Sequence, residues 1–163
     1  MNAKKMLLAV DASENATRAV DYVTRILNGS QGFEVTVLYI ERPPNRDFFA
    51  TEEEWLAASQ SQEQKIREFM DEARATLLTS GLPADKVQLD YIPSCQSGMK
   101  QAAEFCSLGT SIARDILTYQ QGGGFGTLVI GRRGISRAEE FLFGSVTTKV
   151  THLAKNCTIW VVQ

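Results

Sequence analysis

The chain has 163 residues, of which 44% are hydrophobic and 22% charged, and its net charge is −2. This length and composition are typical of one globular domain with its own core. The charge gives no basic surface for nucleic acid, and no apolar stretch approaches the ~18 residues of a membrane span. No secretory leader pattern is visible either, so we expect a single domain, residues 1–163, in the cytoplasm.

Strands and helices are predicted to alternate along the chain. Short apolar or β-branched runs predict strands, and apolar residues at helical spacing predict helices. The first predicted helix is expected to bury Ile26. The alternation predicts an α/β fold, with an open five-stranded parallel sheet and helices on both faces. Strands are expected at 6–10, 35–40, 87–92, 127–130 and 158–162, and helices at about 15–27, 52–78, 111–119 and 146–154.

Two segments far apart in the sequence are predicted to share a ligand-binding crevice. Parallel sheets of this kind bind ligands at the carboxyl ends of their strands, where the strand order reverses. Asp11 and Gly131 each lie at the carboxyl end of a predicted strand. We therefore expect them to face the same crevice, with a purely structural role at the start of the first helix as the alternative for Asp11.

The three cysteines, Cys95, Cys106 and Cys157, are widely spaced. Their odd number and spacing give neither a disulfide framework nor a paired-cysteine metal motif. We therefore expect three reduced, structural thiols, as is usual in cytosolic proteins. No metal-binding residues are predicted, and no catalytic set such as Ser-His-Asp can be assembled from the sequence.

The most specific motif is Gly131-Arg-Arg-Gly134, followed after nine residues by Gly144-Ser145. It lies between a predicted buried strand and a predicted helix. Glycines let the backbone approach an anion closely, and the free N–H groups and dipole of a helix start attract it. The motif is neither a Walker A loop nor the dinucleotide fingerprint GxGxxG. It predicts nucleotide phosphates here; the alternative is a tight connection in which the glycines only permit turns.

These motifs resemble the universal stress protein family over nearly the whole chain. The matching segments are 7–13, 128–134, 144–150 and 157–162. The glycine spacing is that of the family's ATP-binding branch, G-x2-G-x9-G-(S/T). The resemblance implies a Rossmann-like fold of the adenine nucleotide α-hydrolase-like type. Ala12 stands where the family often has glycine, and 94–108 resembles an insertion that could narrow the crevice.

The resemblance implies a site for ATP, possibly with Mg²⁺. The glycines and Ser145 would line the ribose and phosphates, Val146 would contribute its N–H, and Asp11 would contact ribose or a metal. Arg133 could pair with phosphates or remain a solvated loop arginine. The implied binding residues are Ala9, Asp11, Ile40, Ile130, Gly131, Arg133, Gly134, Gly144, Ser145 and Val146.

The expected function is a stress-response or signalling module that couples binding of an adenine nucleotide to interaction with unknown protein partners. Two alternatives stay open: a dimeric interaction protein that keeps the fold without nucleotide, and a slow ATPase, which is disfavoured because no general base is evident. A homodimer is expected through the apolar strand Thr158 to Val162, because the family often dimerises by its last strands and an apolar edge favours pairing.

Overall fold

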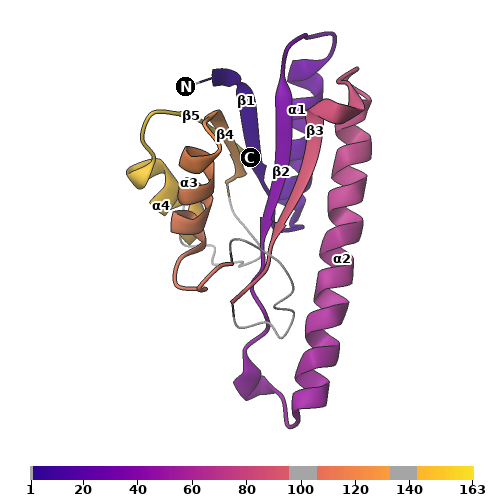
Figure 1. Ribbon diagram of the computed structural model, residues 1–163, viewed down its shortest axis with the longest axis vertical. Coiled ribbons are helices and arrows are strands. Elements are labelled where there is room, and N and C mark those ends of the chain that lie inside the picture. The colour runs from indigo at the N-terminus through magenta and orange to yellow at the C-terminus, as the bar shows by residue number, and fades with distance from the viewer. Residues whose placement is uncertain (1, 96–105, 133–142) are drawn as a thin grey trace.

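The computed structural model describes residues 2–95, 106–132 and 143–163 (Figure 1). In the described residues, five strands form one sheet in the order β3-β2-β1-β4-β5, and every neighbouring pair is parallel. The chain therefore builds outward from β1 to β3, returns to the other side of β1, and ends at the opposite edge. The strands are β1 (Asn2–Ala9), β2 (Glu34–Ile40), β3 (Val87–Ile92), β4 (Phe125–Gly131) and β5 (Thr158–Val162).

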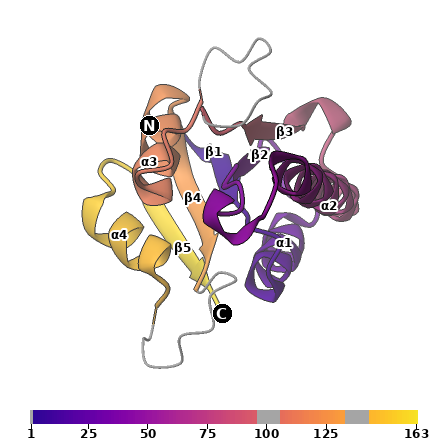
Figure 2. The same cartoon turned by 90° about the horizontal axis from the view of Figure 1, so that it is seen from below.

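Helices cover both faces of the sheet. Figure 2 shows α1 and α2 on one face and α3 and α4 on the other. Two hydrophobic clusters follow this division, one containing α1 and α2 residues and the other containing α3 and α4 residues. The helices are α1 (Glu14–Leu27), α2 (Glu52–Leu78), α3 (Ile112–Gly122) and α4 (Ser145–Leu153), with short 3₁₀ turns η1 (Arg46–Phe48) and η2 (Ala84–Lys86).

The central strands are apolar on both sides because both faces are covered. In β1, Met6 and Leu8 pack into the α1–α2 cluster, whereas Leu7 packs into the α3–α4 cluster. All three side chains are fully buried. A continuous apolar run is what a strand of a covered parallel sheet requires, so the predicted α/β fold with an open five-stranded parallel sheet is confirmed.

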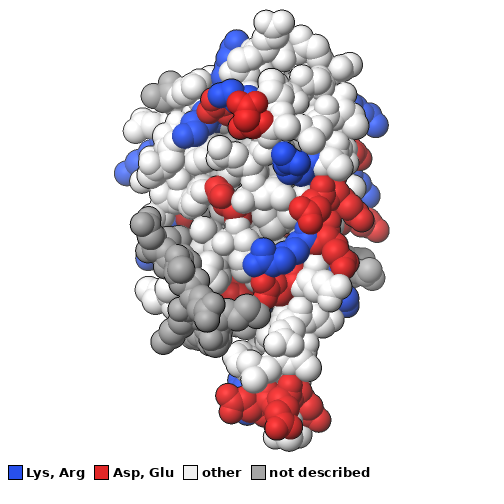
Figure 3. Space-filling view, turned by 45° about the vertical axis from the view of Figure 1, so that its right-hand side comes forward, with Lys and Arg blue, Asp and Glu red and all other residues white. Residues whose placement is uncertain are grey.

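The long helix α2 begins at a capping arrangement beyond the end of the sheet. The Thr51 hydroxyl accepts the N–H of Glu54 at 3.2 Å, and the Glu54 carboxylate accepts the N–H of Ala50 at 3.1 Å. Acidic side chains gather at this projecting tip (Figure 3), where Glu52, Glu53 and Glu54 occupy the first turn. Negative charge is favourable there because the helix dipole is positive at its N-terminus.

The predicted strands and helices are present in the structure. The prediction that α1 buries Ile26 is wrong. Ile26 is 48% exposed. The stripe of α1 that faces the sheet contains Ala16, Val20, Val23 and Leu27, and Ile26 lies outside it.

None of the described helices is long and apolar enough to cross a membrane. Residues 96–105, which form most of the predicted insertion at 94–108, lie outside the described residues.

Cys95 and Cys106 form a disulfide bond, so the expectation of three reduced thiols is wrong for this pair; Cys157 is free. The two cysteines are brought together by backbone pairing of the segments that carry them. Ser94 and Ser107 form a parallel bridge, and the N–H of Cys95 donates to the carbonyl of Ser107 at 2.8 Å. Sequence spacing does not reveal such tertiary pairing.

We expect reduction of this disulfide to destabilise the protein. The bond spans 11 residues of sequence, and closing such a loop contributes about 3 kcal/mol by restricting the unfolded chain. Reductant should therefore lower the melting temperature of the native protein by about 5–10 °C and leave that of the double variant Cys95→Ser/Cys106→Ser unchanged. Thermal unfolding with and without a dithiol measures this.

The free cysteine supplies the control for that measurement. Cys157→Ser should respond to reductant as the native chain does, because Cys157 takes no part in the disulfide. Thiol titration of denatured, unreduced protein should find only the Cys157 thiol. Detection of all three thiols before reduction would show that the pair is not bonded in solution.

Candidate functional site

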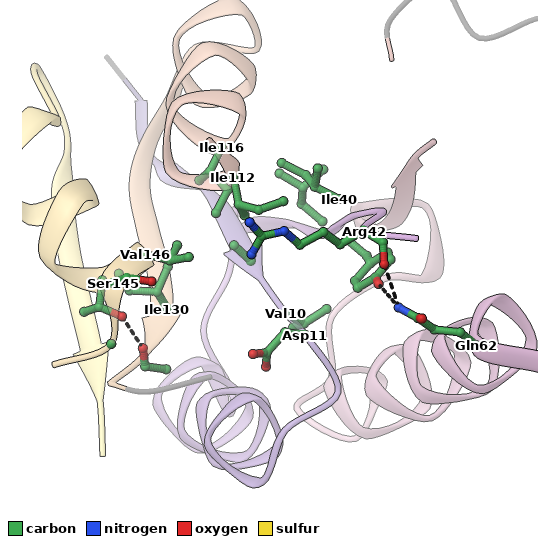
Figure 4. A pocket seen from close by; sticks show the side chains of 16 residues that line it. Val10, Asp11, Ile40, Arg42, Gln62, Ile112, Ile116, Ile130, Ser145 and Val146 are labelled. Carbon is green, nitrogen blue, oxygen red and sulfur yellow. Dashed lines mark hydrogen bonds between the residues drawn. The ribbon is translucent and has the colours of Figure 1, made fainter. Parts of the chain in front are cut away.

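A cavity of about 460 Å³ lies at the carboxyl ends of β1, β2 and β4. The strand order reverses between β1 and β4, which is the position where open parallel sheets bind ligands. Side chains from α2 and α3 and the first turn of α4 complete its wall (Figure 4). Asp11 and Gly131 both line this cavity, so the prediction that they face one crevice is confirmed.

Most of the predicted binding residues line this one cavity. Arg133 and Gly134 lie outside the described residues. The wall also contains polar side chains that the sequence did not indicate, Arg42 and Gln62 among them. The predicted residues that line the cavity are Ala9, Asp11, Ile40, Ile130, Gly131, Gly144, Ser145 and Val146.

One end of the cavity is formed by the N-terminus of α4. Gly144 occupies the N-cap position and has no side chain with which to cap the helix, so the N-cap residue leaves the N–H groups of the first turn to another acceptor. The Thr147 hydroxyl donates to the carbonyl of Gly131 at 2.9 Å, and the N–H of Gly144 donates to the carbonyl of Arg132 at 3.0 Å. These bonds hold the positive end of the helix beside the end of β4, which suits an anion.

Gly131 has a packing role that does not depend on a ligand. A Cβ added at Gly131 would lie 2.9 Å from Cβ of Asn15 and 3.1 Å from its carbonyl carbon. These distances are too short for any side chain, so the end of β4 approaches the start of α1 only because residue 131 is glycine. Gly131 is therefore needed for packing, a role that differs from the turn-permitting one given as the alternative for the motif, whatever the cavity binds.

Asp11 follows β1, and its carboxylate lies in the cavity wall between the elements that carry Ser145 and Arg42 (Figure 4). It is half-buried, and its Oδ1 accepts the N–H of Ser13 at 3.2 Å. Ser13 in turn caps α1 by accepting the N–H of Ala16 at 3.2 Å. Asp11 thus shapes the turn after β1 and also contributes a carboxylate to the cavity wall.

The opposite end of the cavity, below β2 and α3, is apolar. Ile40 and Ile116 are buried there, with 6% and 4% of their surface exposed, and Ile112 lies beside them. Ile130, which is 3% exposed, lies on β4 beside Ser145 and Val146 (Figure 4). The i, i+4 spacing of Ile112 and Ile116 indicated one face of a helix, but only the tertiary fold brings that face to the ends of β1 and β4. An apolar slot next to a helix N-terminus suits a planar base linked to a phosphate.

Tyr39 and Gln62 close the wall between β2 and α2. The Gln62 Nε2 group lies 3.5 Å from the Tyr39 hydroxyl and donates to the carbonyl of Arg42 at 3.0 Å. Burial raises the pKa of Tyr39, and the charge of Glu41 raises it further. Tyr39 therefore stays protonated at neutral pH and adds a neutral polar edge to the cavity.

Comparison with known proteins agrees with this geometry. The model of the universal stress protein family matches residues 2–163. The chain belongs to the universal stress protein family. It is 26% identical over 159 residues to universal stress protein YxiE of Bacillus subtilis (strain 168), covering 98% of each chain.

Solved structures of related fold include nucleotide complexes. The structure of hypothetical protein MJ0577 matches with a TM-score of 0.73 and 20% identity, over 99% of this chain and 96% of that one. A universal stress protein from Archaeoglobus fulgidus, solved in complex with dAMP, matches with a TM-score of 0.60 and 17% identity, over 98% and 97% of the two chains. These matches support the Rossmann-like α/β fold.

The turn between Asp11 and Ser13 is strained. Ala12 has a φ of 56°, in the left-handed region that a Cβ disfavours. We expect Ala12→Gly to stabilise the fold by about 0.5–1 kcal/mol, since relief of strain exceeds the extra freedom of glycine in the unfolded chain. Urea unfolding measures this.

The same substitution in a helix is the matched control for the turn. Ala75 is exposed within α2, where glycine costs about 1 kcal/mol. Ala75→Gly should therefore lower the free energy of unfolding, while Ala12→Gly raises it. A loss of similar size in both variants would contradict strain at Ala12.

Proposed function

We propose that this protein binds an adenine nucleotide, ATP in particular, in the cavity at the ends of β1, β2 and β4. The observation that carries the proposal is the juxtaposition in one cavity of a helix N-terminus with glycine, Gly144, at its N-cap and an apolar slot formed by Ile40, Ile112 and Ile116. Phosphates need the first, and a base needs the second. A relative of the same fold solved with dAMP supports an adenine ligand.

The arrangement of the strands sets the orientation of the nucleotide. The phosphates would lie at the first turn of α4, against the N–H groups of Ser145 and Val146. The ribose would lie over β1 near Asp11, and the base would enter the slot under β2 and α3. Neighbouring strands are about 4.8 Å apart, so the ends of β2 and β4 are about 10 Å apart, which supports a ligand with the length of a nucleoside phosphate.

Magnesium would reach the site with the phosphates. Asp11 is the only carboxylate among the described residues that line the cavity, and the described part of the chain contains no group of three metal-ligating side chains. Mg²⁺ readily keeps several waters and binds nucleotide oxygens. The ion would therefore be held mainly by ATP and water, with Asp11 as one protein ligand.

We further propose that nucleotide binding controls interaction with protein partners, as part of a stress-response or signalling role in the cytoplasm. The cytoplasmic location stays a prediction, and the Cys95–Cys106 disulfide is unusual for that compartment. The alternatives are a protein that keeps the fold without nucleotide and a slow ATPase. Nucleotide released by denaturing the purified protein, followed by titration with Mg-ATP, separates binding from its absence.

Substitutions at Gly144 test the phosphate position. Gly144 has a φ of −66° and a ψ of 160°, which asparagine and aspartate adopt readily at an N-cap. We expect Gly144→Asp to weaken ATP binding at least tenfold more than Gly144→Asn, because only aspartate places negative charge where the phosphates lie. Isothermal titration calorimetry measures the two dissociation constants.

The asparagine variant controls for the size of the new side chain. Both variants should keep the melting temperature of the native protein or raise it, because either residue caps α4. Equal ATP affinities in the two variants would place the phosphates elsewhere.

We also propose that the protein forms a homodimer through β5. Among the described strands, β5 pairs only with β4 and lies at the edge of the sheet, and its residues Ile159 to Val162 are only partly buried. An apolar edge with free backbone groups favours pairing with a second copy.

A charge on the edge should weaken that dimer. We expect Thr158→Lys, at an exposed position of β5, to shift the protein from dimer to monomer at micromolar concentration, since lysine on an edge strand opposes pairing. Analytical ultracentrifugation measures the change. Ser61→Lys, which adds the same charge to an exposed position of α2, should leave the dimer intact. A native protein that sediments as a monomer would contradict the proposal.

A further inference from the structure

Arg42 lies at the apolar end of the cavity, immediately after β2. Its side chain extends across the cavity toward α3, where Ile112 and Ile116 lie (Figure 4). Among the described residues that line the cavity, Arg42 is the only cation. Arg42 is exposed as a residue, so its charge remains in contact with solvent while its side chain borders the apolar slot.

The backbone of Arg42 is fixed by hydrogen bonds, whereas its guanidinium forms none within the described part of the chain. The Gln62 amide donates to the carbonyl of Arg42 at 3.0 Å. On the other side, the buried carboxylate of Glu41 accepts the N–H of Ser94, and the N–H of Glu41 donates to the carbonyl of Ile92 at 2.8 Å. Within the described part of the chain, no hydrogen bond or ion pair is formed by the Arg42 guanidinium.

The strand order determines which part of a nucleotide meets this guanidinium. Arg42 follows β2, whereas the N-terminus of α4 lies beyond β4, and β1 separates these two strands. A nucleotide with its phosphates at α4 therefore has its base, rather than its phosphates, beside Arg42. The guanidinium extends toward the isoleucines of α3 (Figure 4), so a base that enters the slot would meet its planar face.

We propose that Arg42 stacks on the nucleobase and so contributes to binding through the base alone. The inference rests on the proposed function, since it takes the position of the phosphates from it. Arginine stacks on the faces of aromatic rings and bases through its planar, weakly hydrated cation. The chemistry recognised is the flat π-face of the base.

Binding of AMP, ADP and ATP to Arg42→Ala tests the stacking. We expect the same loss of affinity for all three nucleotides, about 5- to 30-fold, because a cation–π contact with the base does not depend on the number of phosphates. Arg42→Lys should lose most of the same factor, since an ammonium group lacks the planar surface. Isothermal titration calorimetry at two salt concentrations supplies the dissociation constants.

Arg46→Ala is the matched control. Its guanidinium is hydrogen-bonded to the carbonyls of Phe49 and Thr51, outside the cavity, and the substitution removes the same charge from the same segment. A loss at Arg42→Ala that grows from AMP to ATP, or that Arg42→Lys restores, would assign Arg42 to the phosphates and overturn the stacking. Unchanged affinity in Arg42→Ala would overturn it as well.

The two proposals fail in different ways. Native protein that binds ATP and loses it in Gly144→Asp, but not in Arg42→Ala, leaves the nucleotide site standing and removes the role of Arg42. Native protein that binds none of the three nucleotides overturns both.

Discussion

The site depends on the reversal of strand order between β1 and β4. The chain leaves β1 toward β2 and β3 on one side, and continues with β4 and β5 on the other. The connections after β1 and β4 therefore diverge, α1 packing on one face and α4 on the other. Since right-handed crossovers force this separation, a cavity opens between the two strand ends. The turn at Asp11 and the N-terminus of α4 both face it.

Several residues at this cavity support the fold as well as the proposed ligand. Gly131 permits contact between β4 and α1, and Asp11 accepts a hydrogen bond that shapes the turn before α1. Gly144, in contrast, has backbone angles open to any residue and leaves α4 without a side-chain cap. Glycine at an N-cap forgoes only about 0.3 kcal/mol of helix stability relative to asparagine or aspartate.

The apolar end of the cavity, at β2 and α3, is built from segments that lie far apart in the sequence. The hydrogen bonds of Gln62, on α2, tie it to the end of β2. Glu41 joins the same strand end to Ser94, next to the disulfide of Cys95 and Cys106. The Ser107 hydroxyl donates to Asp115 of α3 at 2.6 Å. The two segments joined by the Cys95–Cys106 disulfide are thus linked to β2 and α3, the two elements that border the apolar end of the cavity.

The sequence by itself determined the order of elements, the parallel sheet and the glycine at the N-terminus of α4, because apolar runs, helical periods and glycine spacing are local signals. Local patterns also placed Asp11, Gly131 and Gly144 at element ends, from which their meeting followed. Only the tertiary structure showed which residues join the predicted Ile40 in the cavity wall, and that Cys95 and Cys106 are bonded. Arg42, Gln62 and Ile116 come together, and Cys95 meets Cys106, through packing and backbone pairing between distant segments, which leave no local trace in the sequence.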